Sequence, residues 1–195
     1  MKIILCGPPR SGKSCLREGL KQVIIRIKNA PYPYVITACP DGEGSWFQET
    51  ANYDLELAVK YKTAYKSKFT PEFVKRIVDS VRNCTLPLTF VDIGGIISEE
   101  NKEICAHATH AIILAGDMSR IPEWRTFCKE LGIKVIAEIF SDYYGHEDTV
   151  ADMSEDSIFK GSVHYLERGE DVSKRPCIVA LAKHLVEQVA HEEKN

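Results

Sequence analysis

One eight-residue segment near the start of the chain restricts the fold more than any other part of the sequence. Residues Gly7–Ser14 read Gly-Pro-Pro-Arg-Ser-Gly-Lys-Ser, which has the form Gly-x-x-x-x-Gly-Lys-Ser. A short apolar run, 2–6, precedes the segment, and a helical pattern of apolar residues over 16–27 follows it. A strand, a glycine-rich turn and a helix in this order predict the first unit of an α/β fold.

The same segment is typical of loops that hold phosphate groups. Its glycines allow backbone N–H groups to turn inward, and the start of the following helix adds partial positive charge. We expect Lys13 to neutralise the β- and γ-phosphates of a nucleotide and the Ser14 hydroxyl to bind Mg²⁺. The predicted nucleotide-binding residues are Gly7, Pro8, Pro9, Arg10, Ser11, Gly12, Lys13, Ser14 and Cys15.

Alternating apolar patterns along the chain predict the rest of the fold. Buried parallel strands read as short apolar runs; these occur at 2–6, 34–38, 86–91, 111–115 and 134–139, with 163–166 as a candidate sixth. Helices are expected over 16–27, from Pro71 to about 81 after a Thr70 cap, from Ser98 toward His107, over 124–131 before Gly132, and over 175–191. The alternation predicts a three-layer α/β sandwich with a mostly parallel sheet of five or six strands, in one domain spanning 1–195.

An acidic residue, Asp92, is predicted to complete the metal site with Ser14. Asp92 follows the buried run 88–91 and precedes Ile93-Gly94-Gly95. Such a carboxylate holds the Mg²⁺ of a bound nucleotide, and a glycine three residues later resembles a switch segment that contacts the γ-phosphate, so Gly95 is a candidate nucleotide contact. The alternative is that Asp92 only caps the following turn.

The loop after the second predicted strand is the candidate for substrate chemistry. Residues 39–46 combine Asp41 and Glu43 with Gly42, Gly44 and a tryptophan. Either acid could orient an attacking water or hydroxyl, or bind Mg²⁺ through water, and the glycines would let the loop close. A plain surface turn also favours aspartate and glycine, so this alternative stays open.

Further features bear on the choice of ligand. Neither 114–117 nor 140–142 matches the Asn-Lys-x-Asp pattern of GTPases, so we expect ATP rather than GTP. Arg168, after the last predicted strand, is a candidate contact to a phosphate or to the base. The stretch 60–69 interleaves lysines with aromatic residues, and either a solvated helix face or a contact to a small oligonucleotide or second nucleotide would explain it.

Cys105, His107 and His110 are not expected to bind metal, because they lack a matched second pair. Trp124 and Phe127 are expected in the core.

Composition limits the cellular setting. The 195-residue chain has a net charge of -3, which argues against broad binding to duplex DNA or to anionic membranes. Its seven cysteines form no Cys-x-x-Cys pair, as expected for free thiols in a reducing, cytoplasmic compartment. We find no targeting or transmembrane segment.

The assembled segments resemble a small P-loop NTPase family that is associated with CRISPR accessory genes. The family occurs alone or fused to a ring-nuclease-type domain that acts on cyclic oligoadenylate. The resemblance spans nearly the whole chain and rests on the segments 7–14, 38–46, 91–95, 109–112 and 166–169. It implies ATP binding, and hydrolysis as a candidate activity, in prokaryotic defence. The sequence departs from the fused members in lacking a separate ring-nuclease domain, so the resemblance does not imply ring-nuclease activity.

Three functions are consistent with these features. The first is a Mg²⁺-dependent ATPase or ATP-dependent switch in which Lys13, Ser14 and Asp92 hold Mg-ATP. The second is a phosphotransferase acting on a nucleotide or a nucleic-acid end, with Asp41 or Glu43 as base. The third is a module that binds nucleotide or oligoadenylate without turnover. A homo-oligomer is a candidate state, since many P-loop proteins complete their sites across an interface.

Overall fold

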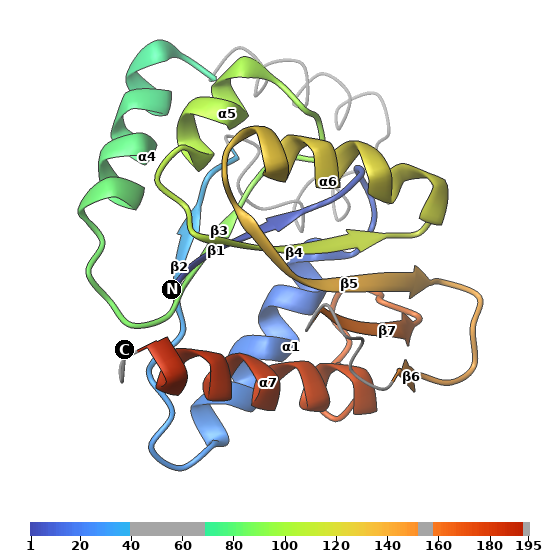
Figure 1. Ribbon diagram of the computed structural model, residues 1–195. Helices are drawn as coiled ribbons and strands as arrows, with labels where there is room; N and C mark the ends of the chain where they lie inside the picture. The colour runs from blue at the N-terminus through green and yellow to red at the C-terminus, as the bar shows by residue number, and fades with distance from the viewer. Residues whose placement is uncertain (40–68, 152–157, 193–195) are drawn as a thin grey trace.

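The computed structural model describes residues 1–39, 69–151 and 158–192. Strands and helices alternate along most of the described chain, as predicted, until β5, β6 and β7 follow one another (Figure 1). In order they are β1 (Lys2–Cys6), α1 (Lys13–Arg26), β2 (Tyr34–Thr37), α4 (Pro71–Asn83), β3 (Thr89–Asp92), α5 (Glu99–Cys105), β4 (His110–Ala115), η1 (Met118–Arg120), α6 (Ile121–Glu130), β5 (Lys134–Asp142), β6 (Thr149–Val150), β7 (Phe159–His164) and α7 (Pro176–Glu192).

All the described strands belong to one seven-stranded sheet with the order β2-β3-β1-β4-β5-β7-β6. Every neighbouring pair is parallel except β6 and β7, which are antiparallel. The sheet is therefore mostly parallel, as predicted, but it has seven strands rather than five or six. In sheet order, the strands β2, β3, β1, β4, β5 and β7 all run in the same direction. Their carboxyl ends therefore lie along one edge of the sheet.

The two missed features of the sheet lie at the same end. The strand expected at 163–166 is instead β7, which begins at Phe159 and ends at His164. Its residues 160–162 are Lys-Gly-Ser, so it lacks the apolar run that marks a buried strand. β6 has only two residues, both exposed, which is too short for a pattern to reveal.

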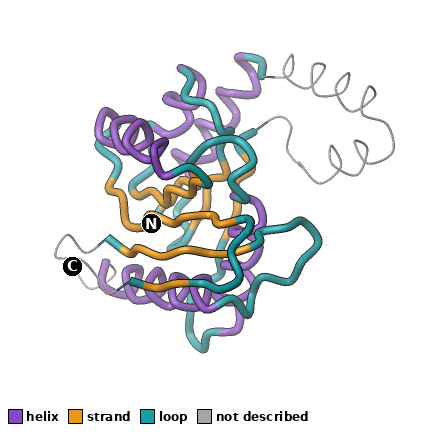
Figure 2. Tube along the Cα trace, turned by 90° about the vertical axis from the view of Figure 1, so that its right-hand side faces the viewer, coloured by secondary structure: helices purple, strands orange, loops and turns teal. Residues whose placement is uncertain are grey.

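Helices cover both faces of the sheet and complete three layers (Figure 2). Alternate strand residues separate into two apolar clusters: Ile3 and Leu5 of β1 pack with α1 and α7, whereas Ile4 and Cys6 pack with α4, α5 and α6. Successive side chains of a strand point to opposite faces, which explains this division. β1 therefore lies at the centre of the sheet with both of its faces buried.

Two of the expected helix caps are present. Thr70 Oγ1 accepts a hydrogen bond from the Phe73 backbone N–H at the start of α4, where Pro71 is the first residue. Ser98 Oγ accepts from the Asn101 N–H at the start of α5. Among the residues described, no helix is both long and apolar enough to cross a bilayer.

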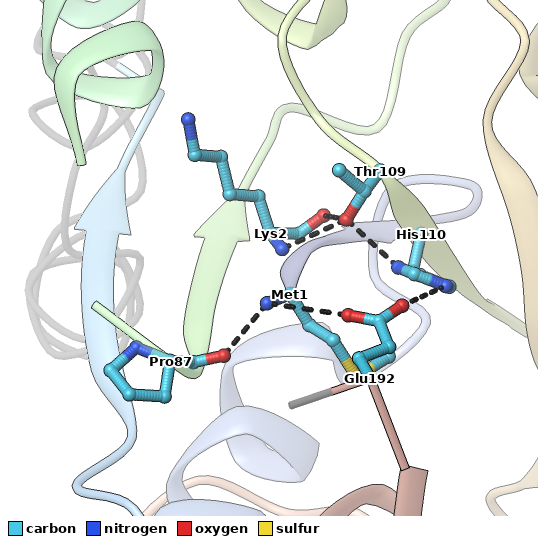
Figure 3. A network of polar contacts seen from close by, with 6 residues as sticks. All are labelled: Met1, Lys2, Pro87, Thr109, His110 and Glu192. Carbon is cyan, nitrogen blue, oxygen red and sulfur yellow. Dashed lines mark hydrogen bonds and ion pairs between the residues drawn. The ribbon is translucent and has the colours of Figure 1, made fainter. Parts of the chain in front are cut away.

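A polar network ties α7 to the amino-terminal ends of β1 and β4 (Figure 3). The amine of Met1 donates to the Pro87 carbonyl at 2.7 Å and lies 3.8 Å from a carboxylate oxygen of Glu192. The other oxygen of Glu192 lies 3.2 Å from Nε2 of His110. This network therefore holds the last turn of α7 against the edge of the sheet opposite to the loop 7–12.

Burial lowers the pKa of His110 from its ordinary 6.5, although the Glu192 carboxylate opposes this shift. Lys134 and the amine of Met1 act in the same direction as burial. Between the lowered pKa of the folded state and pH 6.5, the unfolded chain binds more protons. The contribution of neutral His110 to stability is therefore complete above pH 6.5 and is lost as the pH falls through that interval.

We predict that His110→Gln makes the free energy of unfolding less sensitive to pH. Urea denaturation of the wild type and the variant at pH 7.5 and pH 5.0 measures the difference. The wild type should lose more stability than the variant between the two values, because only the wild type must protonate His110 on unfolding. A larger loss in the variant would show that the sign of the His110 contribution is wrong.

Candidate functional site

The loop between β1 and α1 lies at the carboxyl edge of the sheet. Gly7, Arg10 and Gly12 have positive φ angles of 134°, 62° and 84°, a backbone conformation that favours glycine. Helix α1 begins at Lys13, and its cap residue Gly12 makes no side-chain hydrogen bond to the first turn. The backbone N–H groups at the start of α1 therefore have no capping side chain at residue 12, which leaves this helix end suited to an external acceptor.

Three neighbouring segments press closely on this loop. A Cβ atom on Gly7 would lie 1.9 Å from the Leu114 carbonyl oxygen of β4, and one on Gly12 would lie 2.8 Å from Leu166. A Cβ atom on Gly95 would lie 2.5 Å from the Pro9 nitrogen. Glycine is thus required where the loop meets the ends of β3, β4 and β7. The structure brings together Gly95 and the loop 7–12.

Lys13 points back over the loop. Its Nζ donates to the carbonyl oxygens of Gly7 at 3.0 Å and Pro8 at 2.8 Å. The ammonium charge is therefore held at the mouth of the loop by backbone acceptors. Ser14 and Cys15 follow in the first turn of α1 and are half-buried. Burial also raises the pKa of the Cys15 thiol, which favours its neutral form, while Arg168 opposes the shift.

Asp92 is the last residue of β3 and is only 8% exposed. Its Oδ2 atom accepts a hydrogen bond from Nη1 of Arg17 at 2.9 Å. Arg17 lies on α1, one helical turn beyond Lys13, so residues 13 and 17 share a face of the helix. Asp92 therefore forms an ion pair with a residue that the sequence analysis did not select. The four-residue spacing between Lys13 and Arg17 was the signal in the sequence that could have indicated Arg17.

Arg168 lies in the loop between β7 and α7 and joins this group. It interacts electrostatically with Cys15, Asp92, Glu167 and Arg17, which places it beside the first turn of α1. Its Nη1 atom is buried and has no hydrogen-bond partner in the described part of the chain. Burial lowers the pKa of Arg168 from its ordinary value. A buried guanidinium N–H without an acceptor is costly, and hydrogen bonds from guanidinium to an anionic acceptor are among the strong ones.

Ser11 presents a second unsatisfied group in the loop itself. Its Oγ atom is buried and finds no partner within residues 1–39, 69–151 and 158–192. Pro8 is also buried, whereas Pro9 and Arg10 are exposed. The loop thus combines buried and exposed residues at the carboxyl edge of the sheet.

Several predicted features lie elsewhere. Asp41 and Glu43 lie outside the described residues, as do the lysines and tyrosines of 60–68. Cys105 is buried in α5, and His107 accepts a hydrogen bond from Arg82. No cluster of three or more His, Cys, Asp or Glu side chains suited to a metal ion is found among the described residues. Trp124 and Phe127 are buried in edge-to-face contact, which confirms their prediction as core residues.

Comparison with known proteins adds no assignment: no protein-family model matches the chain, and no curated protein matches its sequence significantly. The residues themselves must therefore carry the functional argument.

We predict that Gly95→Ala lowers the free energy of unfolding by about 1–3 kcal/mol, because its methyl group would overlap the backbone of Pro9. Gly94→Ala is the matched control, since a Cβ atom there would make ordinary contacts at 3.5 Å with Asn101 and 3.6 Å with Cys39. Urea denaturation of both variants measures the effect. Equal stability of the two would contradict the close approach of Gly95 to the loop.

Proposed function

We propose that this chain binds Mg-ATP through the loop Gly7–Ser14 and acts as an ATPase or an ATP-dependent switch. One observation carries the proposal: Lys13, Arg17 and Arg168 converge on the carboxyl end of β3 and the start of α1, and a buried N–H of Arg168 has no acceptor in the described chain. A triphosphate supplies the missing acceptors and the negative charge.

Each residue of the group has a role in this proposal. The backbone N–H groups of the loop and the Lys13 ammonium would hold the β- and γ-phosphates. Arg168 would donate to a phosphate oxygen, which would give its buried N–H the acceptor that it lacks in the described chain. Gly95 contacts Pro9, so a shift of the loop on binding of the γ-phosphate would also shift the segment after β3. Asp41 and Glu43 keep their predicted role of orienting water or an acceptor.

The donor set also fits Mg²⁺. A serine hydroxyl and a carboxylate are the hard oxygen ligands that this ion takes in nucleotide sites, and the remaining ligands are phosphate oxygens and water. Ser14 at the start of α1 and Asp92 at the end of β3 are the residues that would hold it. When bound, the ion neutralises charge that develops on the phosphates.

Loss of the Lys13 charge provides the direct test of this site. We predict that Lys13→Ala raises the dissociation constant of Mg-ATP about 10- to 100-fold, because each hydrogen bond from a charged group contributes about 1.5–3 kcal/mol. Isothermal titration calorimetry measures the affinity, and phosphate release measures turnover. Lys28→Ala, at an exposed position beyond α1, is the control. Unchanged affinity in Lys13→Ala would refute the site.

The Arg17–Asp92 pair generates a second test. The guanidinium occupies an oxygen of Asp92 that a divalent cation would need, so we predict that Arg17→Gln raises the Mn²⁺ affinity of the nucleotide-free protein. A gain of about fivefold corresponds to ~1 kcal/mol, the value of a partly exposed ion pair. The signal of free Mn²⁺ in electron paramagnetic resonance measures it, with Asp92→Asn as the variant that should bind least. A weaker affinity in Arg17→Gln would mean that Arg17 supports the cation instead.

Transfer to a second nucleotide is separated from hydrolysis by following the γ-phosphate. With γ-labelled ATP, an ATPase releases all of the label as inorganic phosphate, whereas a phosphotransferase labels an added nucleotide or oligonucleotide. Binding without either product would identify a nucleotide-binding module. The cytoplasmic setting and a role in prokaryotic CRISPR defence are proposed on the sequence alone.

A further inference from the structure

Three exposed tyrosines gather at the carboxyl ends of β5 and β7. Tyr143, Tyr144 and Tyr165 are 45%, 86% and 42% exposed. The ring of Tyr143 lies 5.3 Å from that of Tyr144, at 90°, and 5.3 Å from that of Tyr165, at 38°. Large exposed aromatic side chains in mutual contact, on the edge where ligands of parallel sheets bind, are typical of a recognition surface.

The tyrosines are held in place by the main chain and by Glu167. Tyr143 donates from its hydroxyl to Oε2 of Glu167 at 2.5 Å. Tyr165 has a φ of 42°, an unfavourable value for a residue with a bulky side chain. Its N–H nevertheless donates to the Asp142 carbonyl, and its own carbonyl accepts from the Glu167 N–H. These contacts hold the Tyr143 hydroxyl and the Tyr165 backbone in place without a ligand.

An open hollow lies beside the rings, and both aromatic and polar side chains line it. It is lined by Tyr143, Tyr144, Gly145, His146, His164, Tyr165 and Arg175. Arg175 contacts Nε2 of His164, and Nδ1 of His164 lies 2.6 Å from Oδ1 of Asp148. The Asp148 side chain is completely buried, and its other oxygen accepts from the Cys177 N–H at the start of α7. This chain of contacts holds the Arg175 guanidinium at the hollow.

The hollow is connected to the loop that carries Lys13. Tyr165 is followed directly by Leu166, whose side chain packs against Gly12, and Arg168 comes two residues later. Glu167, which accepts from Tyr143, also accepts from the Arg168 N–H. The segment 165–168 therefore begins at Tyr165, in the tyrosine cluster, and ends at Arg168, whose Nη1 atom is buried.

We propose that the tyrosine hollow binds a nucleobase. Tyrosine rings in mutual contact suit stacking, and the Arg175 guanidinium with the His146 imidazole suits the polar edge of a base or its phosphate. The base has two sources, the nucleotide held at Lys13 or a second nucleotide such as one unit of an oligoadenylate. The first source rests on the proposed function, and the second does not.

Calorimetry with Tyr144→Ala tests this site, because Tyr144 is almost fully exposed and its loss leaves the core intact. Removing a stacked ring costs about 1–3 kcal/mol per base, or roughly 5- to 150-fold in affinity. We expect such a loss for Mg-ATP, with affinity for tripolyphosphate, which has no base, unchanged. Tyr144→Phe should retain the wild-type affinity. Tyr32→Ala, at a 61% exposed tyrosine outside the cluster, should have no effect.

Each other result assigns the base or removes the proposal. A loss for linear or cyclic oligoadenylate with unchanged ATP affinity would support the hollow as a site for a second nucleotide. Equal losses for ATP and tripolyphosphate, or no loss for any ligand, would overturn it. If Lys13→Ala leaves ATP binding unchanged while Tyr144→Ala weakens it, the tyrosine site stands and the phosphate site falls.

Discussion

The contact between Gly95 and the loop 7–12 is the constraint on which the rest of the site depends. β1 is buried on both faces at the centre of a parallel sheet, so the chain must leave it through a narrow space between the ends of β3 and β4. Only glycine fits at residues 7 and 95, where a Cβ atom would meet backbone atoms at 1.9 Å and 2.5 Å. Backbone atoms of β4 and of the segment after β3 therefore hold the loop from both sides. A shift of one of these segments must displace the other through the loop.

The charges around the loop are satisfied mostly by the protein itself. Lys13 donates to Gly7 and Pro8, and Arg17 pairs with Asp92. A ligand must exchange these contacts for its own, so its net affinity is smaller than the sum of the new contacts. Arg168 differs because its buried N–H has no described acceptor to lose. This asymmetry makes Arg168 the group with most to gain from an anion.

The fold and half of the site follow from patterns that a single sequence carries. The apolar run of β1 and the glycine spacing after it locate the loop, and the Thr70-Pro71 pair locates the start of α4 within one residue. β7 was misplaced because Lys160 and Ser162 interrupt its apolar pattern on a sheet that nonetheless pairs it with β5. Pairing with β5 and β6, rather than an apolar composition, decides such a strand.

Arg17 and the three tyrosines could not be found in the same way, because their roles come from tertiary neighbours. Arg17 looks like any charged residue on a helix until β3 brings Asp92 beside it, and Tyr165 meets Tyr143 only through the pairing of β5 with β7. Asp92, by contrast, was predicted from its place at a strand end. Sequence therefore predicts residues that belong to one element, whereas residues shared between elements require the structure.

The central claim is that Lys13 and its loop hold the phosphates of a nucleotide. A crystal structure with Mg²⁺ and a non-hydrolysable ATP analogue tests it most directly. The account predicts that Lys13 Nζ leaves the carbonyls of Gly7 and Pro8 for a phosphate oxygen and that Arg168 donates to the same triphosphate. A nucleotide bound elsewhere, with both carbonyl contacts of Lys13 intact, would contradict it.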